Sequence, residues 1–228
     1  MDTGSKRTQG VLSRSWQVLY HDWASDKDAF KQVPWGKAMM WIFLVSDTFV
    51  FSCFLIGYMT VRMTTVEPWP VPSEVFALTI AGQSIPLILI AVMTFILISS
   101  SGTMAMAVNF GYRRNRGATA ALLLATALLG ASFVGMQAFE WSKLIHEGVR
   151  PWGNPMGAAQ FGAAFFTITG FHGMHVSIGV LYLLAVAFKV WRGDLDRAGN
   201  YQLVEIAGLY WHFVDLVWVF IFAFFYLW

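Results

Sequence analysis

Five long apolar stretches, separated by short polar segments, dominate the hydropathy pattern of the chain. They cover residues 38–61, 84–107, 118–138, 161–188 and 206–228. Each is long enough to cross a bilayer as a helix, which takes about 20 residues. The alternation of polar and apolar residues that marks a membrane β-barrel does not occur, and helices satisfy the backbone inside lipid. The pattern therefore predicts an all-α protein, a polytopic membrane bundle of five transmembrane helices.

Polar and helix-breaking residues separate the five stretches. The breaks with most proline, glycine or arginine lie at residues 67–74, 111–117 and 148–155. Residues 1–36 are polar and contain no apolar run like that of a signal peptide. We expect residues 1–36 to form an arm in the cytoplasm or at the membrane surface, with a short helix near residues 11–20. Residues 37–228 then form a single transmembrane domain.

The composition supports a membrane protein and excludes several other classes. Apolar residues make up 57% of the chain and charged residues only 12%, against about 25% charged in ordinary soluble domains. A net charge of +2 gives no basic face for nucleic acid. The single cysteine, Cys53, forms no internal disulfide and builds no zinc or iron–sulfur site by itself.

Lysine and arginine are distributed unevenly between the two sides of the predicted bundle. Twelve lie in the N-terminal arm, the 111–117 turn and the segment after the fourth span; the other side holds Arg62, Lys143 and Arg150. Because cytoplasmic loops carry the excess of positive charge, we expect a cytoplasmic N-terminus and a periplasmic C-terminus.

Asp47 is the one charged residue of the first span. A carboxyl group at mid-membrane has a functional interpretation, as a proton-handling group, and a structural one, as a hydrogen-bonded side chain. No Lys or Arg lies in a predicted span to pair with it. We therefore expect a protonated Asp47 that bonds to another helix, with His172 and His175 as the best candidate partners.

Polar residues three positions apart recur on the last three predicted helices, near the end of the span in the first of them. The pairs are Gln137 and Glu140, His172 and His175, and His212 and Asp215. This spacing places both members on one helix face. Helix bundles can build di-metal sites from such pairs, but they use Glu-x-x-His together with further glutamates. Hydrogen bonding between helices is the other interpretation, and we expect an interhelical polar network and no metal ligand in this chain.

Two basic residues, Lys189 and Arg192, lie three positions apart at the predicted cytoplasmic end of the fourth span. They can bind the phosphate of an anionic lipid, or serve only as the usual positive anchor of that side. Small residues such as Gly130, Gly135 and Gly179 allow close approach between helices.

Three segments of the chain resemble subunit III of the haem–copper terminal oxidases. They are residues 133–141 (FVGMQAFEW), 169–176 (TGFHGMHV) and 210–218 (YWHFVDLVW). They occur in the order of the family and each in the corresponding span. The resemblance covers residues 35–228, and the five spans correspond to the short bacterial form of a family that often has seven helices.

The resemblance implies an accessory, cofactor-free subunit in a bacterial inner membrane. Haem and copper would belong to the partner subunits I and II, and this chain would bind phospholipid, stabilise subunit I and support proton uptake during oxygen reduction. Lys189 and Arg192 match the basic pair of the family. Gln137 and Trp141 look like the cytochrome c branch, whereas Asp47, in place of the usual glutamate, is similar to the quinol-oxidising branch. We expect a cytochrome c oxidase subunit; the alternatives are subunit III of a quinol oxidase and an accessory subunit of nitric oxide reductase.

Two unrelated classes remain as hypotheses. A transporter would use Asp47, Glu140 and Asp215 along a path, but transporters show broken helices and internal repeats, and no repeat is visible in the sequence. A membrane metalloenzyme would use the histidine pairs, and metal analysis of the isolated chain would distinguish it.

Overall fold

The computed structural model describes residues 33–80, 83–85 and 87–228. The predicted helix near residues 11–20, and all but the last four residues of the predicted arm, lie outside these ranges. The chain divides into two compact units, Met1–Ile42 and Phe43–Trp228. All the candidate site residues fall in the second unit.

Five helices of the described chain are long and apolar enough to cross a membrane, which confirms the predicted all-α class. They are α2 (Trp35–Thr64), α4 (Ile88–Tyr112), α5 (Arg116–His146), α6 (Ala159–Arg192) and α8 (Gln202–Phe222), which continues as the π-helix η1 (Ala223–Leu227). At 34 residues, α6 is about 50 Å long, and the hydrocarbon core is only about 30 Å thick. Its ends therefore extend into the interfacial regions.

The start of α4 differs from the predicted start of the second span at residue 84. Residues Gln83–Ile85 form β2, which pairs antiparallel with β1 (Leu78–Ile80). The helix begins only after Leu87, whose φ is 58°. The sequence contains the reason, since the residue before a proline, here Ile85 before Pro86, favours an extended backbone.

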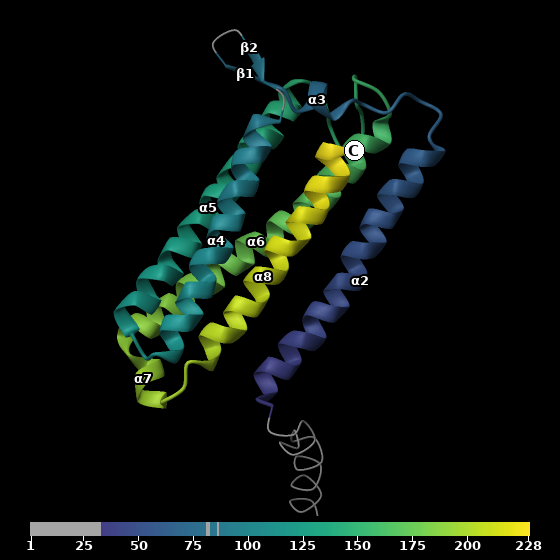
Figure 1. Ribbon diagram of the computed structural model, residues 1–228. Helices are drawn as coiled ribbons and strands as arrows, with labels where there is room; N and C mark the ends of the chain where they lie inside the picture. The colour runs from purple at the N-terminus through teal and green to yellow at the C-terminus, as the bar shows by residue number, and fades with distance from the viewer. Residues whose placement is uncertain (1–32, 81–82, 86) are drawn as a thin grey trace, which may run out of the picture. The chain divides into compact units, whose positions relative to one another are not determined.

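Helices α4, α5, α6 and α8 pack against one another in the second unit, each beside its chain neighbour and α8 against both α4 and α6 (Figure 1). Two indole groups of α8 connect it to α4. Trp211 Nε1 donates to Ser100 Oγ at 2.9 Å, and Trp218 Nε1 donates to Thr94 Oγ1 at 3.1 Å. Both tryptophans are fully buried, so these bonds satisfy the indole N–H groups inside the bundle.

Close approach of α5 to α8 depends on a glycine. A Cβ atom built on Gly130 would lie 2.8 Å from Trp211 Cζ2 and 2.9 Å from Val180 Cγ2, which is closer than real side-chain contacts. Any other residue at this position would force the tryptophan to move.

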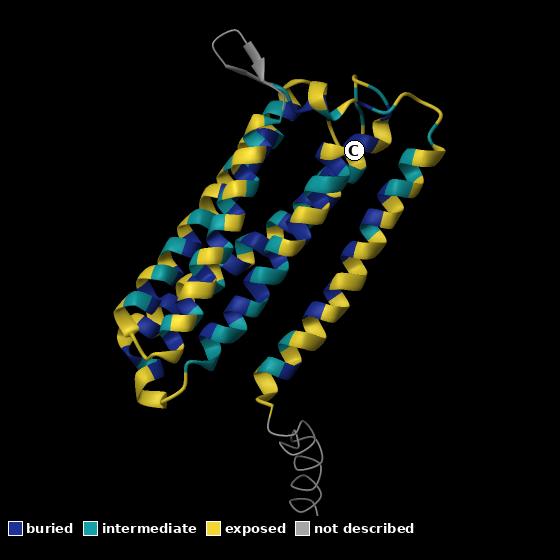
Figure 2. Ribbon diagram, viewed as in Figure 1, coloured by how far each residue is buried: buried dark blue, intermediate teal, exposed yellow. Residues whose placement is uncertain are grey.

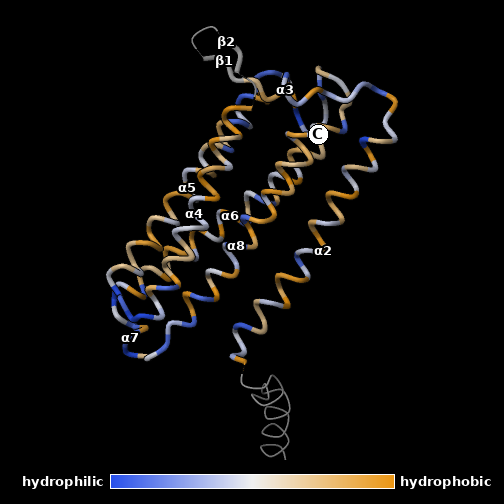
Figure 3. Tube along the Cα trace, viewed as in Figure 1, coloured by the Kyte–Doolittle hydropathy of each residue, from blue (hydrophilic) through white to orange (hydrophobic). Residues whose placement is uncertain are grey.

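The outer faces of the helices are apolar. Phe95, Leu128 and Leu181 are each about 70% exposed, at 71%, 70% and 67%. Exposed positions are distributed along the outer faces (Figure 2), and hydrophobic residues extend over most of each long helix (Figure 3). A soluble protein rarely exposes so much apolar surface, whereas lipid contact accounts for it.

Residues 43–64 of α2 contact the bundle through aromatic rings. The Phe51 and Phe171 ring centroids are 5.3 Å apart, and those of Tyr58 and Phe225 are 4.1 Å apart. Between α2 and α8 the surface is hollowed into an apolar groove of about 200 Å³. A second hollow of about 380 Å³ continues it along both helices.

One end of the bundle gathers basic residues. Arg116 donates to the carbonyl of Trp191, and Arg114 donates to the carbonyl of Gly199 at 3.4 Å. These bonds connect the α4–α5 turn to the segment around the short helix α7 (Asp194–Ala198). At the other end of the bundle lie η1 and the short helix α3 (Pro72–Val75).

Candidate functional site

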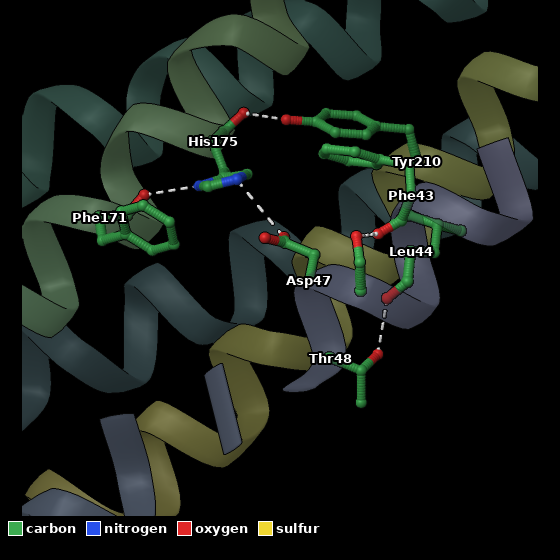
Figure 4. A network of polar contacts seen from close by, with 8 residues as sticks. Phe43, Leu44, Asp47, Thr48, Phe171, His175 and Tyr210 are labelled. Atoms are coloured by element: carbon green, nitrogen blue, oxygen red, sulfur yellow. Dashed lines mark hydrogen bonds and ion pairs between the residues drawn. The ribbon is translucent and has the colours of Figure 1, made fainter. Parts of the chain in front are cut away.

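The Asp47 carboxyl group of α2 faces His175 of α6 (Figure 4). Asp47 Oδ2 lies 3.4 Å from His175 Nε2, and both residues are buried. The distance is longer than that of a strong hydrogen bond. This oxygen has no hydrogen-bond partner with proper geometry among the described residues, so its contact with His175 is a close approach of two ionisable groups.

The second ring nitrogen of His175 fixes the proton arrangement of the pair. Nδ1 lies 2.8 Å from the carbonyl oxygen of Phe171, and a carbonyl oxygen can only accept. Nδ1 therefore carries a proton, and in a neutral imidazole Nε2 is then a lone pair. A lone pair and a carboxylate would repel each other. A proton on either Nε2 or Oδ2 removes this repulsion, and the pair is then neutral overall whichever atom holds it.

The surroundings of this pair are aromatic. The His175 ring lies 4.7 Å from the Phe171 ring and 5.6 Å from the Phe51 ring, centroid to centroid. Tyr210 of α8 donates its hydroxyl to the backbone carbonyl of His175 at 2.9 Å. The pair thus connects α2 to α6, and Tyr210 connects α6 to α8.

The neighbouring hydroxyl groups of α2 do not compete for Asp47. Ser46 donates to the carbonyl of Phe43 at 2.7 Å, and Thr48 donates to that of Leu44 at 2.8 Å. Both bonds stay within α2, as is common for Ser and Thr in transmembrane helices.

His172, three residues earlier on α6, lies in a different environment. It is 1% exposed, and neither ring nitrogen has a hydrogen-bond partner among the described residues. Its ring stacks on Trp218 at 5.5 Å and meets the edge of Phe133 at 6.0 Å. His172 is therefore placed as an aromatic packing residue, separate from the Asp47 contact.

Glu140 forms a second buried polar group near the end of α5. Gln137 Nε2 donates to Glu140 Oε2 at 2.9 Å, and the Tyr226 hydroxyl donates to the same oxygen at 3.0 Å. The Lys143 ammonium group does not donate to Glu140. It donates to the carbonyl of Ala77 and forms an ion pair with Glu147, with Nζ 3.4 Å from Oε1. The group connects α5 to η1, because the π-helical turn carries Tyr226.

A third polar cluster connects α4 to α8. Ser101 Oγ lies 2.7 Å from His212 Nδ1, and the Ser101 hydroxyl also interacts with the Asp215 carboxyl group. His212 and Asp215 are only partly buried. This cluster lies at the surface of the chain, unlike the first two.

The two basic residues at the end of α6, Lys189 and Arg192, are exposed. The Arg192 guanidinium lies 5.6 Å from the Phe188 ring centroid, so its side chain folds back along the helix. Both residues remain on the surface at the basic end of the bundle.

The predicted polar residues therefore occupy four separate places: the Asp47–His175 pair, the packing site of His172, the Gln137–Glu140 group and the His212–Asp215 cluster. Within residues 33–80, 83–85 and 87–228, no three His, Cys, Asp or Glu side chains form a group that could hold a metal ion. Three of the described histidines lie in different surroundings: His172 beside Trp218, His175 beside Asp47 and His212 beside Ser101.

Three contributing residues were not singled out from the sequence: Ser101, Tyr210 and Tyr226. Tyr210 lies inside the segment YWHFVDLVW, where it could have been considered. Ser101 is one of several hydroxyl residues in its span and carries no distinguishing signal. Tyr226 lies in the π-helical turn η1, which the hydropathy pattern does not reveal.

Comparison with known proteins gives a consistent match. Residues 27–228 match the family model of cytochrome c oxidase subunit III. The chain is 33% identical over 187 residues to cytochrome bo(3) ubiquinol oxidase subunit 3 of Pseudomonas aeruginosa, which covers 82% of each chain. It is 32% identical over 183 residues to quinol oxidase subunit 3 of Bacillus spizizenii, covering 80% of this chain and 82% of that one.

A probable quinol oxidase subunit 3 of Staphylococcus saprophyticus is 30% identical over 188 residues, covering 82% of this chain and 86% of that one. These matches confirm the resemblance that the three sequence segments indicated. The chain belongs to the cytochrome c oxidase subunit III family and is a multi-pass membrane subunit of a haem–copper oxidase.

Proposed function

We propose that this chain is subunit III of a quinol oxidase. The observation that carries the proposal is that the similar proteins from Pseudomonas, Bacillus and Staphylococcus are all named as quinol oxidase subunits. Asp47, in the place where the cytochrome c branch usually has glutamate, favours the same branch. The expectation of a cytochrome c oxidase subunit, based on Gln137 and Trp141, has less support than this alternative.

Its role in the complex is accessory. The described residues offer no group of ligands for a metal, and the buried polar residues make contacts that hold helices together. Asp47 and His175 connect α2 to α6, and Tyr226 and Glu140 connect η1 to α5. Such contacts suit a rigid subunit that stabilises subunit I, while haem and copper in the partner subunits carry the electrons.

The charge distribution supports an orientation in a bacterial inner membrane. Arg113 and Arg114 lie in the α4–α5 turn, and Arg116 is the first residue of α5. Lys189 and Arg192 belong to the end of α6, where Arg116 donates to the carbonyl of Trp191. By the positive-inside rule this end faces the cytoplasm, and the C-terminal residue faces the periplasm. Lys189 and Arg192 would then bind the phosphate of an inner-leaflet phospholipid, and a negatively charged lipid at this end would support proton uptake nearby.

Purification of the tagged chain in mild detergent tests the accessory role. We expect the chain to purify with a complex that contains haem and copper. After removal of the chain, that complex should still reduce oxygen but be less stable. A partner with non-haem iron and no copper would assign the chain to nitric oxide reductase. Complete loss of the haem signal from a complex that remains otherwise intact would contradict an accessory role.

A further inference from the structure

The two carboxyl oxygens of Glu140 have different surroundings, although the whole residue is buried, at 3% exposure. Oε2 accepts hydrogen bonds from Gln137 and Tyr226. Oε1 is enclosed and has no hydrogen-bond partner among the described residues. Leaving a buried oxygen without a hydrogen bond is unfavourable, and ordered water is the usual partner of such an atom. Oε1 therefore calls for a small hydrogen-bond donor.

A small hollow, named here the Glu140 hollow, lies beside this carboxyl group. Its walls come from α3 and the residue after it, from α4 and from α5. The lining residues are Val75, Phe76, Leu89, Glu140, Lys143 and Leu144. The volume open to a water-sized sphere is about 10 Å³, which is roughly the space of one water molecule. An acyl chain or a hydrated ion is too large for it.

Lys143 supplies the second polar group of the Glu140 hollow. It follows Glu140 by three positions, so both side chains lie on one face of α5. Its ammonium group has three protons. The Ala77 carbonyl accepts one of them and the Glu147 carboxylate takes a second, so a third remains for another acceptor. The ammonium group acts electrostatically on Glu140, but it does not bond Oε1 directly.

A water molecule fits both polar groups at once. It can accept a hydrogen bond from the Lys143 ammonium group and donate one to Glu140 Oε1. Buried waters make two to four hydrogen bonds, and a contact through water is nearly as favourable in enthalpy as a direct one. A metal ion does not suit the hollow, because the ammonium group would repel it beside a single carboxylate.

The far side of Lys143 reaches the surface of the chain. The side chains of Lys143 and Glu147 are 21% and 34% exposed, whereas Glu140 Oε1 is enclosed. Lys143 belongs to the last turn of α5, which the Glu140–Tyr226 bond places at the same end of the bundle as η1. A water between Glu140 and Lys143 thus lies between a buried carboxyl group and an exposed ion pair.

We propose that Glu140 and Lys143 bind one water molecule between Oε1 and Nζ, and that this water connects the buried carboxyl group to the aqueous phase at the η1 end of the bundle. A proton that leaves Oε1 passes to the water, which releases one of its own protons to solvent; the reverse transfer reloads the carboxyl group. The site consists of residues of this chain alone, so it does not depend on which electron donor the complex uses.

A structure of the intact complex that resolves ordered waters tests the binding site. We expect a density peak within about 3.2 Å of both Glu140 Oε1 and Lys143 Nζ. Lys143→Met, which keeps an unbranched side chain but removes the ammonium group, should lose the peak. Glu147→Gln leaves Lys143 in place and should keep it. A wild-type hollow without a peak, or a Lys143 ammonium group in direct contact with Oε1, would overturn the proposal.

X-ray radiolysis of the complex, without oxygen and in water that carries a heavy oxygen isotope, tests the connection to solvent. A bound water yields a hydroxyl radical that hydroxylates a neighbouring side chain. Phe76 lines the hollow, so mass spectrometry should find it hydroxylated several-fold more than Phe133, a buried residue of α5 that does not line it. The added oxygen should be the heavy isotope, and Lys143→Met should reduce the yield to that of Phe133.

The outcomes of radiolysis separate the two parts of the proposal. Equal hydroxylation of Phe76 and Phe133 in the wild-type complex would mean that the hollow holds no water. Hydroxylation of Phe76 with the ordinary isotope would mean a trapped water that does not exchange with solvent. An unchanged yield in Lys143→Met would remove Lys143 from the site. Each of these results contradicts the proposal, and none of them bears on the proposed function.

Discussion

Asp47 Oδ2 and His175 Nε2 lie 3.4 Å apart, one on α2 and the other on α6. His175 Nδ1 already donates to the Phe171 carbonyl, so a proton on either His175 Nε2 or Asp47 Oδ2 makes the pair neutral overall. A polar contact that is neutral overall costs far less inside a membrane than a single charge.

Replacing Asp47 should therefore distinguish hydrogen bonding from charge. Asp47→Asn should preserve assembly and most electron transfer, since the amide N–H can donate to His175 Nε2. Asp47→Leu should destabilise the subunit by about 1–3 kcal/mol, because it leaves a buried imidazole nitrogen unpaired. Thermal denaturation of the purified complex measures the stability of both variants, with Ser46→Ala as a control on the same helix. Loss of proton pumping in Asp47→Asn, with assembly intact, would make Asp47 an obligatory proton carrier.

Tyr226→Phe should destabilise the end of the bundle. The change removes one of the two hydrogen-bond donors to Glu140 Oε2, the other being Gln137. We expect a loss of about 0.5–1.5 kcal/mol, the range for one hydrogen bond whose acceptor keeps a second donor. Tyr182→Phe on α6, at a tyrosine outside the Glu140 group, is the control. Equal denaturation temperatures for the two variants would show that the Glu140 contact contributes nothing.

Gly130→Ala and Gly135→Ala should have opposite effects, although both lie on α5. At Gly130 the added methyl group would clash with Trp211 and Val180, and overpacking of this kind costs about 1–3 kcal/mol. At Gly135 no atom lies within 4 Å of the added Cβ, and alanine favours helix by up to about 1 kcal/mol. Chemical unfolding in detergent compares the stability of the two variants. A Gly130→Ala variant as stable as the wild type would contradict the close packing of α5 on α8.

Removal of both basic residues at the end of α6 should reduce tightly bound lipid. Lys189 and Arg192 are exposed and three positions apart, so both can reach one phosphate. Mass spectrometry of the intact complex counts the lipids in the double alanine variant. Arg197→Ala, at the same end but paired with Asp194 at 3.6 Å, should leave the count unchanged. If the double variant also keeps its lipids, the pair serves only as a positive anchor.

The isolated chain should have no haem absorption and no stoichiometric copper, iron or zinc. Among the residues described, His and carboxylate side chains do not converge on a common point. Elemental analysis and an optical spectrum of the stripped subunit test this. A stoichiometric metal that is lost with His212→Ala would instead assign a site to the cluster on α4 and α8.

The number and class of the helices follow from the sequence because long apolar stretches have few alternatives in lipid. The helix ends were less predictable. Apolar composition does not mark where α5 and α6 stop, and these helices continue for several residues beyond the apolar stretches. At α4 the local β-hairpin determined the boundary.

The polar contacts were predictable only in part. From the sequence, His172 and His175 were equally good candidates as the partner of Asp47. The rotation of α6 against α2 decides between them. That rotation is set by side-chain packing and not by residue spacing. His172 lies beside Trp218 and Phe133 instead. Tyr226 lies in a π-helical turn that residue spacing could not indicate.

The electron donor of the purified complex tests the proposed function most directly. Oxygen uptake is measured with a reduced short-chain quinol and, separately, with reduced cytochrome c, on the complex that the tagged chain retains. A subunit III of a quinol oxidase predicts rapid uptake with the quinol and none above background with cytochrome c. Rapid uptake with cytochrome c and none with the quinol would contradict it.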